Sequence, residues 1–382
     1  MGVVVLTLVV VFNPENPVVI SDVLLSAQYR STDGFMPNGT PFFAADFPTD
    51  GLSPHSFTQK MIILKDGAVL ALVVGEFDRG RMVVDRLRDA IKAGLTIDGL
   101  NGWLSGKSAF CGKKSSVIIC WIEDSRYVVG CAGPIVQRVE VAGTTALFSG
   151  SGSDWFLRLP IRLGRVLHQK GNFDPSEYLR MQAVAQGGFH LLNERVLRTN
   201  SSFGGGFQTA YYDGLKFRMS DDITYLMWKV DHDDNGKAFN IDLFPQIVVQ
   251  RYEVPDLCFD VADLTPHSPL REEAHVVFSG EAKLRRTIVP SLLRQGAVST
   301  IAPRGVCTTP IIDNQVVHVW NGHIVHVSGN QLMGDPTLLG VQIRQDGDRY
   351  ELTMSREIEQ YFDAIALPTD WKERAVPLRP KG

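Results

Sequence analysis

An acidic stretch in the middle of the chain has the spacing of a calcium-binding loop. Residues 231–242 read DHDDNGKAFNID, so that Asp231, Asp233, Asn235 and Asp242 fall where such a loop supplies oxygen ligands. Carboxylate and amide oxygens are hard donors that suit Ca²⁺. The flanking segments read as strands rather than as the helices of an EF-hand, which favours an acidic turn. Calcium is kept as the weaker alternative, and no other cofactor is expected.

A second stretch with ligand-type residues is VVHVWNGHIVHV at 316–327. The pair Asn321-Gly322 predicts a hairpin with a two-residue type I′ turn. That pairing places His318 and His323 on one face of the hairpin and His326 on the other. Two histidines can bind zinc, but no Cys, Asp or Glu lies close enough in sequence to complete the ligand set. A metal-dependent binding module in this region is therefore the third functional alternative.

The chain opens on MGVVVLTLVVVF, in which Thr7 is the one polar side chain. The apolar run stops at Phe12, about half of the roughly 20 residues that a membrane-spanning helix needs. No Lys or Arg precedes Asn13, as a secretion signal would require. The β-branched valines favour a strand, buried on both faces. We therefore expect neither a membrane anchor nor a signal peptide.

The composition is that of a globular protein of two domains. The chain has 382 residues, of which 44% are hydrophobic and 21% charged. The net charge of -4 gives no basic surface for nucleic acid, so no nucleic-acid partner is expected. Five cysteines without a C-x-x-C pair favour a reducing compartment, from which we predict a cytoplasmic protein.

Hydrophobic periodicity predicts an α+β fold with antiparallel sheets covered by helices. A tight hairpin joins the opening strand to residues 18–27, a long loop covers residues 28–56, and a second hairpin turns at Asp66-Gly67. Helices are expected at 78–94, 151–167 and 174–197, and strands at 115–124, 126–133, 135–141, 144–150, 208–214 and 223–230. Residues 237–382 read as a β-rich second domain, and residues 1–236 as the first.

The order of these pieces resembles the proteasome β-subunit family and the related peptidase subunit of bacterial ATP-dependent proteases, within the N-terminal-nucleophile hydrolase superfamily. The resemblance covers about residues 6–230. The motifs that carry it are TLVVVF with PVVISD, QKMIIL, ALVVGEFDRGRMVVDRLRDAI, ALFSGSGSDWF and SSFGGGFQTAYY. It implies a four-layer αββα sandwich with an added β-rich C-terminal region. It also implies a catalytic set of Thr7, Asp22, Lys60, Gly75 and Ser151.

The family chemistry uses the hydroxyl of a threonine at a free chain end. The terminal amine, which titrates near pH 8, takes the hydroxyl proton. The resemblance implies that Lys60 and Asp22 favour ionisation of the threonine hydroxyl. It implies that Ser151 supports the terminal amine. The amide of Gly75 would stabilise the oxyanion, worth about 3 kcal/mol in comparable sites.

This sequence departs from the family pattern at several positions. Aligning Asp22 places Leu6, or by a one-residue slip Thr7, at the nucleophile position, behind apolar residues that would have to be removed. Leu24 stands where the family has a basic residue, and Asn200 or Ser201 where it has an acid. An insertion from Gln28 to Thr58 roughly doubles the separation of Asp22 and Lys60.

Each candidate site residue also has a purely structural interpretation. Thr7 can be one residue of a buried strand, and Asp22 with Lys60 a buried pair that is costly to break. Ser151 can be a turn or cap residue, and Gly75 a point of close packing.

We therefore predict a divergent, catalytically inactive proteasome-like protein that acts through self-assembly or as a scaffold for a protein partner such as an unfoldase. The alternative is an active N-terminal threonine peptidase or amidohydrolase, processed before Thr7. A homo-oligomer is expected from the family resemblance alone.

Overall fold

The computed structural model describes seventeen stretches of the chain. They are residues 8–12, 17–27, 34–43, 53–134, 136–141, 144–150, 204–220, 223–232, 238–253, 255–264, 270–271, 275–294, 300–302, 315–320, 324–329, 342–346 and 349–355. Thr7, Ser151, Asp233 and Asn235, and the helices expected at 151–167 and 174–197, lie outside them. The described part is rich in sheet with few helices, so the predicted α+β class is confirmed.

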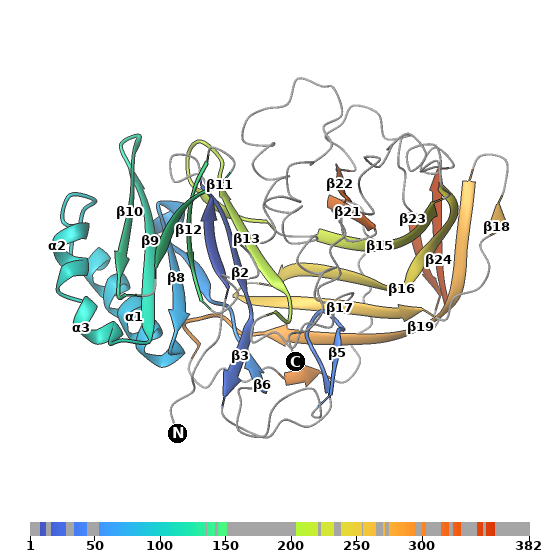
Figure 1. Cartoon of the computed structure of the whole chain (residues 1–382), viewed down its shortest axis with the longest axis horizontal. Helices are drawn as coiled ribbons and strands as arrows, with labels where there is room; N and C mark the ends of the chain where they lie inside the picture. Colours follow the sequence, from blue (N-terminus) through green and yellow to red (C-terminus); the bar gives the residue numbers. More distant parts are fainter. Residues whose placement is uncertain are drawn as a thin grey trace.

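A four-stranded sheet lies against the described helices at one end of the molecule (Figure 1). Its order is β10-β9-β8-β7, all antiparallel. The strands are β7 (Met61–Leu64), β8 (Val69–Gly75), β9 (Ser115–Glu123) and β10 (Arg126–Ala132). The helices are α1 (Phe77–Lys92), α2 (Leu100–Ser105) and α3 (Ser108–Cys111), and a short 3-10 turn, η2 (Lys65–Gly67), joins β7 to β8. The hairpin and the helix predicted here are both confirmed.

A six-stranded sheet lies on the other side of the four-stranded one. Its order is β11-β12-β1-β2-β13-β14, so that the first hairpin occupies the centre. The strands are β1 (Val9–Phe12), β2 (Val18–Asp22), β11 (Gln137–Val141), β12 (Thr144–Ser149), β13 (Phe207–Tyr212) and β14 (Phe217–Met219). Leu8 to Val11 have no exposed surface, which confirms the prediction of a fully buried opening strand for this part of the run.

The alternating side chains of β8 connect the layers. Val69, Ala71 and Val73 pack in a cluster with α1, whereas Leu70, Leu72 and Val74 pack in a second cluster with residues of β1, β2 and β13. A strand buried on both faces must be apolar throughout, as β8 is. Each fully buried Val or Leu side chain of β8 contributes about 1.5–3 kcal/mol relative to an exposed one. Three layers, helix, sheet and sheet, are thus described. The fourth layer of the predicted sandwich stays a prediction, because the helices expected for it lie outside the described residues.

The strand predicted for residues 18–27 is wrong in one respect, because the chain leaves the six-stranded sheet at Val23. The Val23 amide donates to the carbonyls of Gly204 and Gly206, each at 3.2 Å. Beyond it, β3 (Leu24–Ala27) pairs with β6 (Ser53–Phe57) in a separate two-stranded sheet. The segment expected as one long loop therefore contains strands, including the short pair β4 (Gly34–Phe35) and β5 (Pro41–Phe42).

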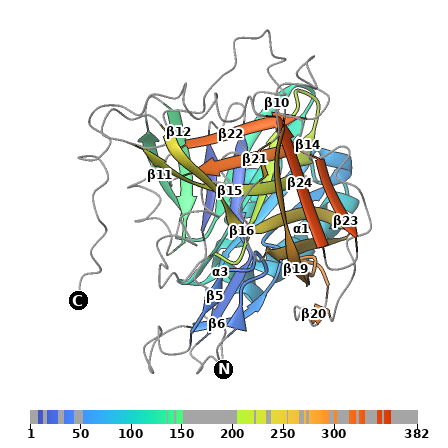
Figure 2. The ribbon, with the colours of Figure 1, turned by 90° about the vertical axis from the view of Figure 1, so that its right-hand side faces the viewer.

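A ten-stranded sheet fills the end of the molecule away from the helices (Figures 1 and 2). Its main path is β22-β21-β15-β16-β17-β19-β24-β23, with β18 and β20 attached to β19. The strands are β15 (Ile223–His232), β16 (Ala238–Glu253), β17 (Asp256–Leu264), β18 (Leu270–Arg271), β19 (His275–Val289), β20 (Thr300–Ala302), β21 (Gln315–Trp320), β22 (Ile324–Gly329), β23 (Gln342–Asp346) and β24 (Arg349–Ser355). The strand β15 belongs to this sheet although it lies before residue 237, where the sequence places the boundary between two domains. The division into two domains at residue 237 stays a prediction.

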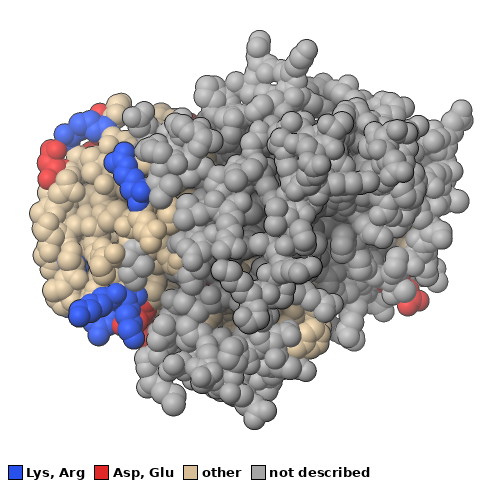
Figure 3. All heavy atoms as spheres, viewed as in Figure 1, with Lys and Arg blue, Asp and Glu red and all other residues tan. Residues whose placement is uncertain are grey.

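Charges of both signs lie side by side on the described surface at the helical end (Figure 3). They form exposed ion pairs, such as Arg126 with Asp98 at 2.9 Å and Arg88 with Asp85 at 3.4 Å. Pairs of this kind contribute about 0–1 kcal/mol each. Within the described residues no helix has the length and apolar character needed to cross a bilayer.

Candidate functional site

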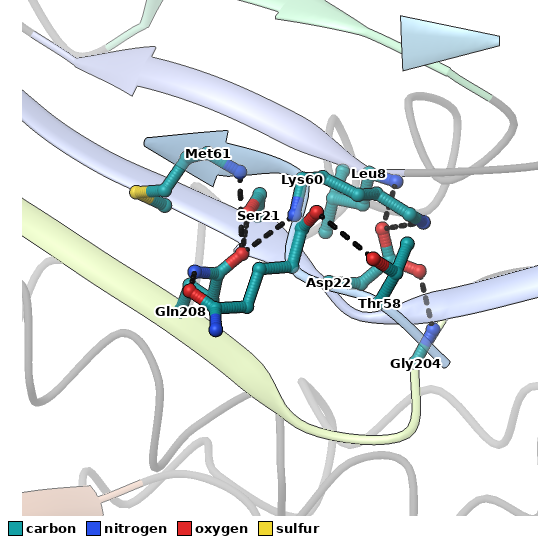
Figure 4. Close-up of polar contacts among 9 residues, drawn as sticks. Leu8, Ser21, Asp22, Thr58, Lys60, Met61, Gly204 and Gln208 are labelled. Atoms are coloured by element: carbon teal, nitrogen blue, oxygen red, sulfur yellow. Dashed lines mark hydrogen bonds and ion pairs between the residues drawn. The ribbon is translucent and has the colours of Figure 1, made fainter. Parts of the chain in front are cut away.

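Asp22 and Lys60 form a buried ion pair where the two stacked sheets meet. Asp22 ends β2, and Lys60 directly precedes β7. The Lys60 Nζ lies 2.7 Å from the Asp22 Oδ1, and the two side chains are 1% and 0% exposed (Figure 4). The structure therefore brings together two of the residues assigned from sequence, across the insertion that separates them in the chain.

The Asp22 carboxylate binds three different parts of the chain. Besides Lys60, its Oδ1 accepts the Leu8 amide at 2.9 Å, and its Oδ2 accepts the Gly204 amide at 3.0 Å. The backbone adds a bond from the Asp22 amide to the Leu8 carbonyl at 3.0 Å. Charge-assisted bonds of this kind are short and strong. The carboxylate thus fixes the start of β1 to the glycine-rich loop before β13.

Burial sets the protonation of Lys60. Loss of hydration lowers the pKa of the Lys60 amine, and the neighbouring Asp22 charge opposes that effect. A lowered pKa is what a lysine would need to accept a proton near neutral pH. A structural ion pair in a dry core has the same property, so the direction of the shift does not separate the two roles.

A buried glutamine that the sequence analysis did not single out organises the backbone around Lys60. The Gln208 Oε1 accepts the Lys60 amide at 2.7 Å and the Met61 amide at 3.2 Å. Its Nε2 donates to the Gln59 Oε1 at 3.2 Å and to the Tyr252 hydroxyl at 3.3 Å. A single Gln in a short strand gives no local signal, because its partners come from distant parts of the chain.

Gln59 and Thr58 extend this network to the ten-stranded sheet. The Gln59 Nε2 donates to the carbonyls of Pro255 at 2.9 Å and Val289 at 3.2 Å, and the Gln59 amide donates to the Pro290 carbonyl at 3.0 Å. The Thr58 hydroxyl also lies 3.3 Å from the Pro290 carbonyl. The C-terminal sheet is therefore bonded to the residues that immediately precede Lys60.

Gly75 ends β8 at the same end of the sheets as Lys60. The Lys60 carbonyl accepts the amide of Val73, which lies two residues before Gly75 on β8. Gly75 has φ +82°, and a Cβ there would lie 1.8 Å from the Lys114 carbonyl oxygen. Glycine is thus required by close packing against the chain that enters β9. The described contacts do not include one between Gly75 and the ion pair.

The chain neighbours of Thr7 and Ser151 lie at this same end. Leu8 donates to Asp22, and Val9 has Ser149, the last residue of β12, as its register partner. Thr7 and Ser151 themselves are outside the described residues. Their catalytic roles, like that of Gly75, stay predictions.

Comparisons with known proteins add little to this geometry. Neither the family models nor the curated proteins compared with the sequence match it. Several solved structures are similar in part. One of them is described as the Anbu (Gly-1) mutant from Hyphomicrobium sp. strain MC1, and it shares 11% identity with a TM-score of 0.30 over 62% of this chain and 87% of its own. At that level of likeness, the description of the site rests on the contacts above.

The acidic stretch 231–242 is only partly described. Asp231 pairs with Asn240 and Asp242 with Lys229 in the β15–β16 ladder, so strands flank the turn as expected. No group of three or more His, Cys, Asp or Glu able to hold a metal occurs among the described residues. The calcium site stays a prediction.

Because strand pairing continues to His232 and Ala238, we expect the turn to need no ion. The melting temperature of the full chain should then shift by no more than about 1 °C between millimolar calcium and excess chelator, since a ligand stabilises only the state that binds it. A calcium-dependent rise of several degrees, absent in an Asp233→Ala variant, would instead assign the ion to this turn.

The histidine hairpin at 316–327 has a different register from the predicted one. Trp320 pairs with Ile324, so the loop holds three residues rather than two. His318 is consequently the register partner of His326, and the predicted pairing of faces is wrong. A shift of one residue in a hairpin exchanges the faces of an entire strand.

Proposed function

We propose that this chain is a divergent proteasome-like protein with an αββα sandwich and an added β-rich C-terminal region, in which the ancestral nucleophile site is catalytically inactive. The Asp22–Lys60 pair then serves to hold the start of β1. The protein acts through self-assembly or as a scaffold for a protein partner. The three described layers and the order of the family motifs support the architecture.

The observation that carries the proposal is the complete engagement of the Asp22 carboxylate. Its two oxygens accept three donors, from Lys60, Leu8 and Gly204, within 3.0 Å. All of this lies in a region closed to solvent. A carboxylate engaged in this way stabilises the beginning of β1, which is a structural role that needs no substrate.

The register of the first hairpin supports the loss of the nucleophile. Asp22 hydrogen-bonds to Leu8 through both backbone and side chain, and the next pair in the ladder is Val9 with Ser21. Register partners share a face, and successive residues of an extended chain alternate faces. Leu8 therefore shares a face with Asp22, and in the sequence the residue two positions before Leu8 is a leucine and not Thr7.

The alternative, an active threonine peptidase or amidohydrolase processed before Thr7, has one observation in its favour. Burial lowers the pKa of the Lys60 amine, as proton transfer from a nearby hydroxyl would require. This alternative requires removal of the six residues that precede Thr7 in the sequence. Hydrolysis of peptide or amide substrates that is lost in a Thr7→Ala variant would favour it.

Self-assembly is the part of the proposal that rests on the family resemblance. We expect native mass spectrometry of the full chain at micromolar concentration to show a discrete homo-oligomer, because closed symmetric assemblies are the common form for such subunits. A monomer at that concentration, with no larger species by light scattering, would contradict self-assembly and leave a heterologous scaffold role.

A further inference from the structure

The β4–β5 hairpin is a small unit inserted between Asp22 and Lys60. Its turn is closed by the Met36 amide bonded to the Thr40 carbonyl and the Gly39 amide bonded to the Met36 carbonyl, both at 2.8 Å. The Asn38 Oδ1 accepts the Thr40 amide at 3.0 Å. Met36, Asn38 and Thr40 are all buried. The tip of this hairpin, unlike most turns, thus points into the protein.

The tip docks on the loop that holds Asp22. The Asn38 amide donates to the Gly205 carbonyl at 3.1 Å. Pro37 packs closely there, because a Cβ on Gly205 would lie 3.3 Å from its Cδ. The adjacent Gly204 amide is the one that binds the Asp22 Oδ2. One residue of backbone therefore separates the hairpin contact from the carboxylate.

Two described features of the hairpin favour its local opening. Phe35, at its base, is half exposed and is stacked against the Arg285 guanidinium of β19, 3.8 Å from the ring centroid. The Thr40 hydroxyl is buried without a hydrogen-bond partner among the described residues, which costs free energy in the closed position. A segment that is fastened in part by an exposed ring and that carries an unsatisfied buried polar group can open locally before the whole protein unfolds.

We propose that the β4–β5 hairpin is a strap that closes the Asp22–Lys60 pair from solvent, is held shut by the Phe35–Arg285 contact, and opens as a unit. Opening frees the Gly205 carbonyl and loosens the Gly204 amide from Asp22. The strap concerns access to the site, so it holds for an inactive site and for an active one. Its test is independent of oligomer size and of processing at the chain start.

The test uses the full chain and a Phe35→Ala variant, which removes the contact without emptying the core. Hydrogen exchange follows the Asn38 amide, and acetylation by acetic anhydride followed by mass spectrometry measures the accessibility of Lys60. Exposed Lys114 is the internal reference in the same sample. Loss of a cation–π contact that is partly exposed to solvent changes a local opening equilibrium by roughly threefold to tenfold. We therefore expect the exchange rate of the Asn38 amide and the acetylation rate of Lys60 to rise by that factor.

Two further variants make the result decisive. Arg285→Leu removes the same contact from the other side and must reproduce the effect. Met82→Ala alters a comparably exposed side chain on α1 and must change neither rate. Protection of the α1 amides shows that each variant is folded. Faster exchange at Asn38 with unchanged Lys60 acetylation would overturn the strap, and so would two unchanged rates.

Discussion

Replacing Asp22 with alanine is expected to destabilise the two stacked sheets by about 3–5 kcal/mol, the usual cost of removing one partner of a buried ion pair. The variant leaves the Lys60 amine without its counter-ion in a region closed to solvent. It also removes the acceptor of the Leu8 and Gly204 amides. Hydrogen exchange of the β8 and β9 amides measures the loss locally, which avoids treating the whole chain as a two-state system.

Two controls separate the buried pair from charge effects in general. Asp98→Ala breaks an exposed pair with Arg126 and should cost no more than about 1 kcal/mol. The double replacement Asp22→Leu with Lys60→Met removes both charges and should regain part of the lost stability, because an apolar pair pays no desolvation cost. An Asp22→Ala loss no larger than that of Asp98→Ala would show that the pair does not hold β1.

Replacing Gly75 with alanine is expected to cost about 3 kcal/mol or more. A Cβ at this position meets the Lys114 carbonyl oxygen at 1.8 Å, and the backbone has φ +82°, a region that other residues adopt at a cost of about 1–2 kcal/mol. Since Lys114 leads directly into β9, the clash can be relieved only by moving the strand. Exchange of the β9 amides reports the change.

The matched control is Gly94, just after the end of α1. Gly94 has φ +95°, and no atom lies within 4 Å of its would-be Cβ. Gly94→Ala therefore carries the backbone cost alone, about 1–2 kcal/mol. Equal losses for the two alanine variants would refute the close-packing role of Gly75. If the Gly75 amide had a purely catalytic role, Gly75→Ala would lower the free energy of unfolding only by the backbone cost that Gly94→Ala also carries.

Local patterns in the sequence were sufficient for the elements whose partners are close in the chain. The apolar spacing of Val83, Val84 and Leu87 predicted α1, and Asp66-Gly67 predicted the β7–β8 hairpin. The short helix α2 was missed because LNGWLS has a glycine in its middle and no capping side chain. Such a helix depends on the packing of Leu100 and Leu104 against the sheet.

The features that depend on distant residues could not be read from the sequence. VVISDVLLSA reads as one continuous strand, so nothing in it marks Val23 as the point where the strand leaves the sheet. That change is fixed by the carbonyls of Gly204 and Gly206, about 180 positions later in the chain. Likewise, Gln208 gains its role only when β13 aligns beside Lys60. The family resemblance was sufficient to predict Asp22 and Lys60, whereas the groups that surround them became visible only in the folded structure.

The mass of the intact purified chain tests the central claim most directly. If the carboxylate of Asp22 secures an unprocessed first strand, the mass corresponds to a chain that starts at Met1 or Gly2. A chain that begins at Thr7, with its hydroxyl and amine released, would contradict the account and establish a self-processing nucleophile.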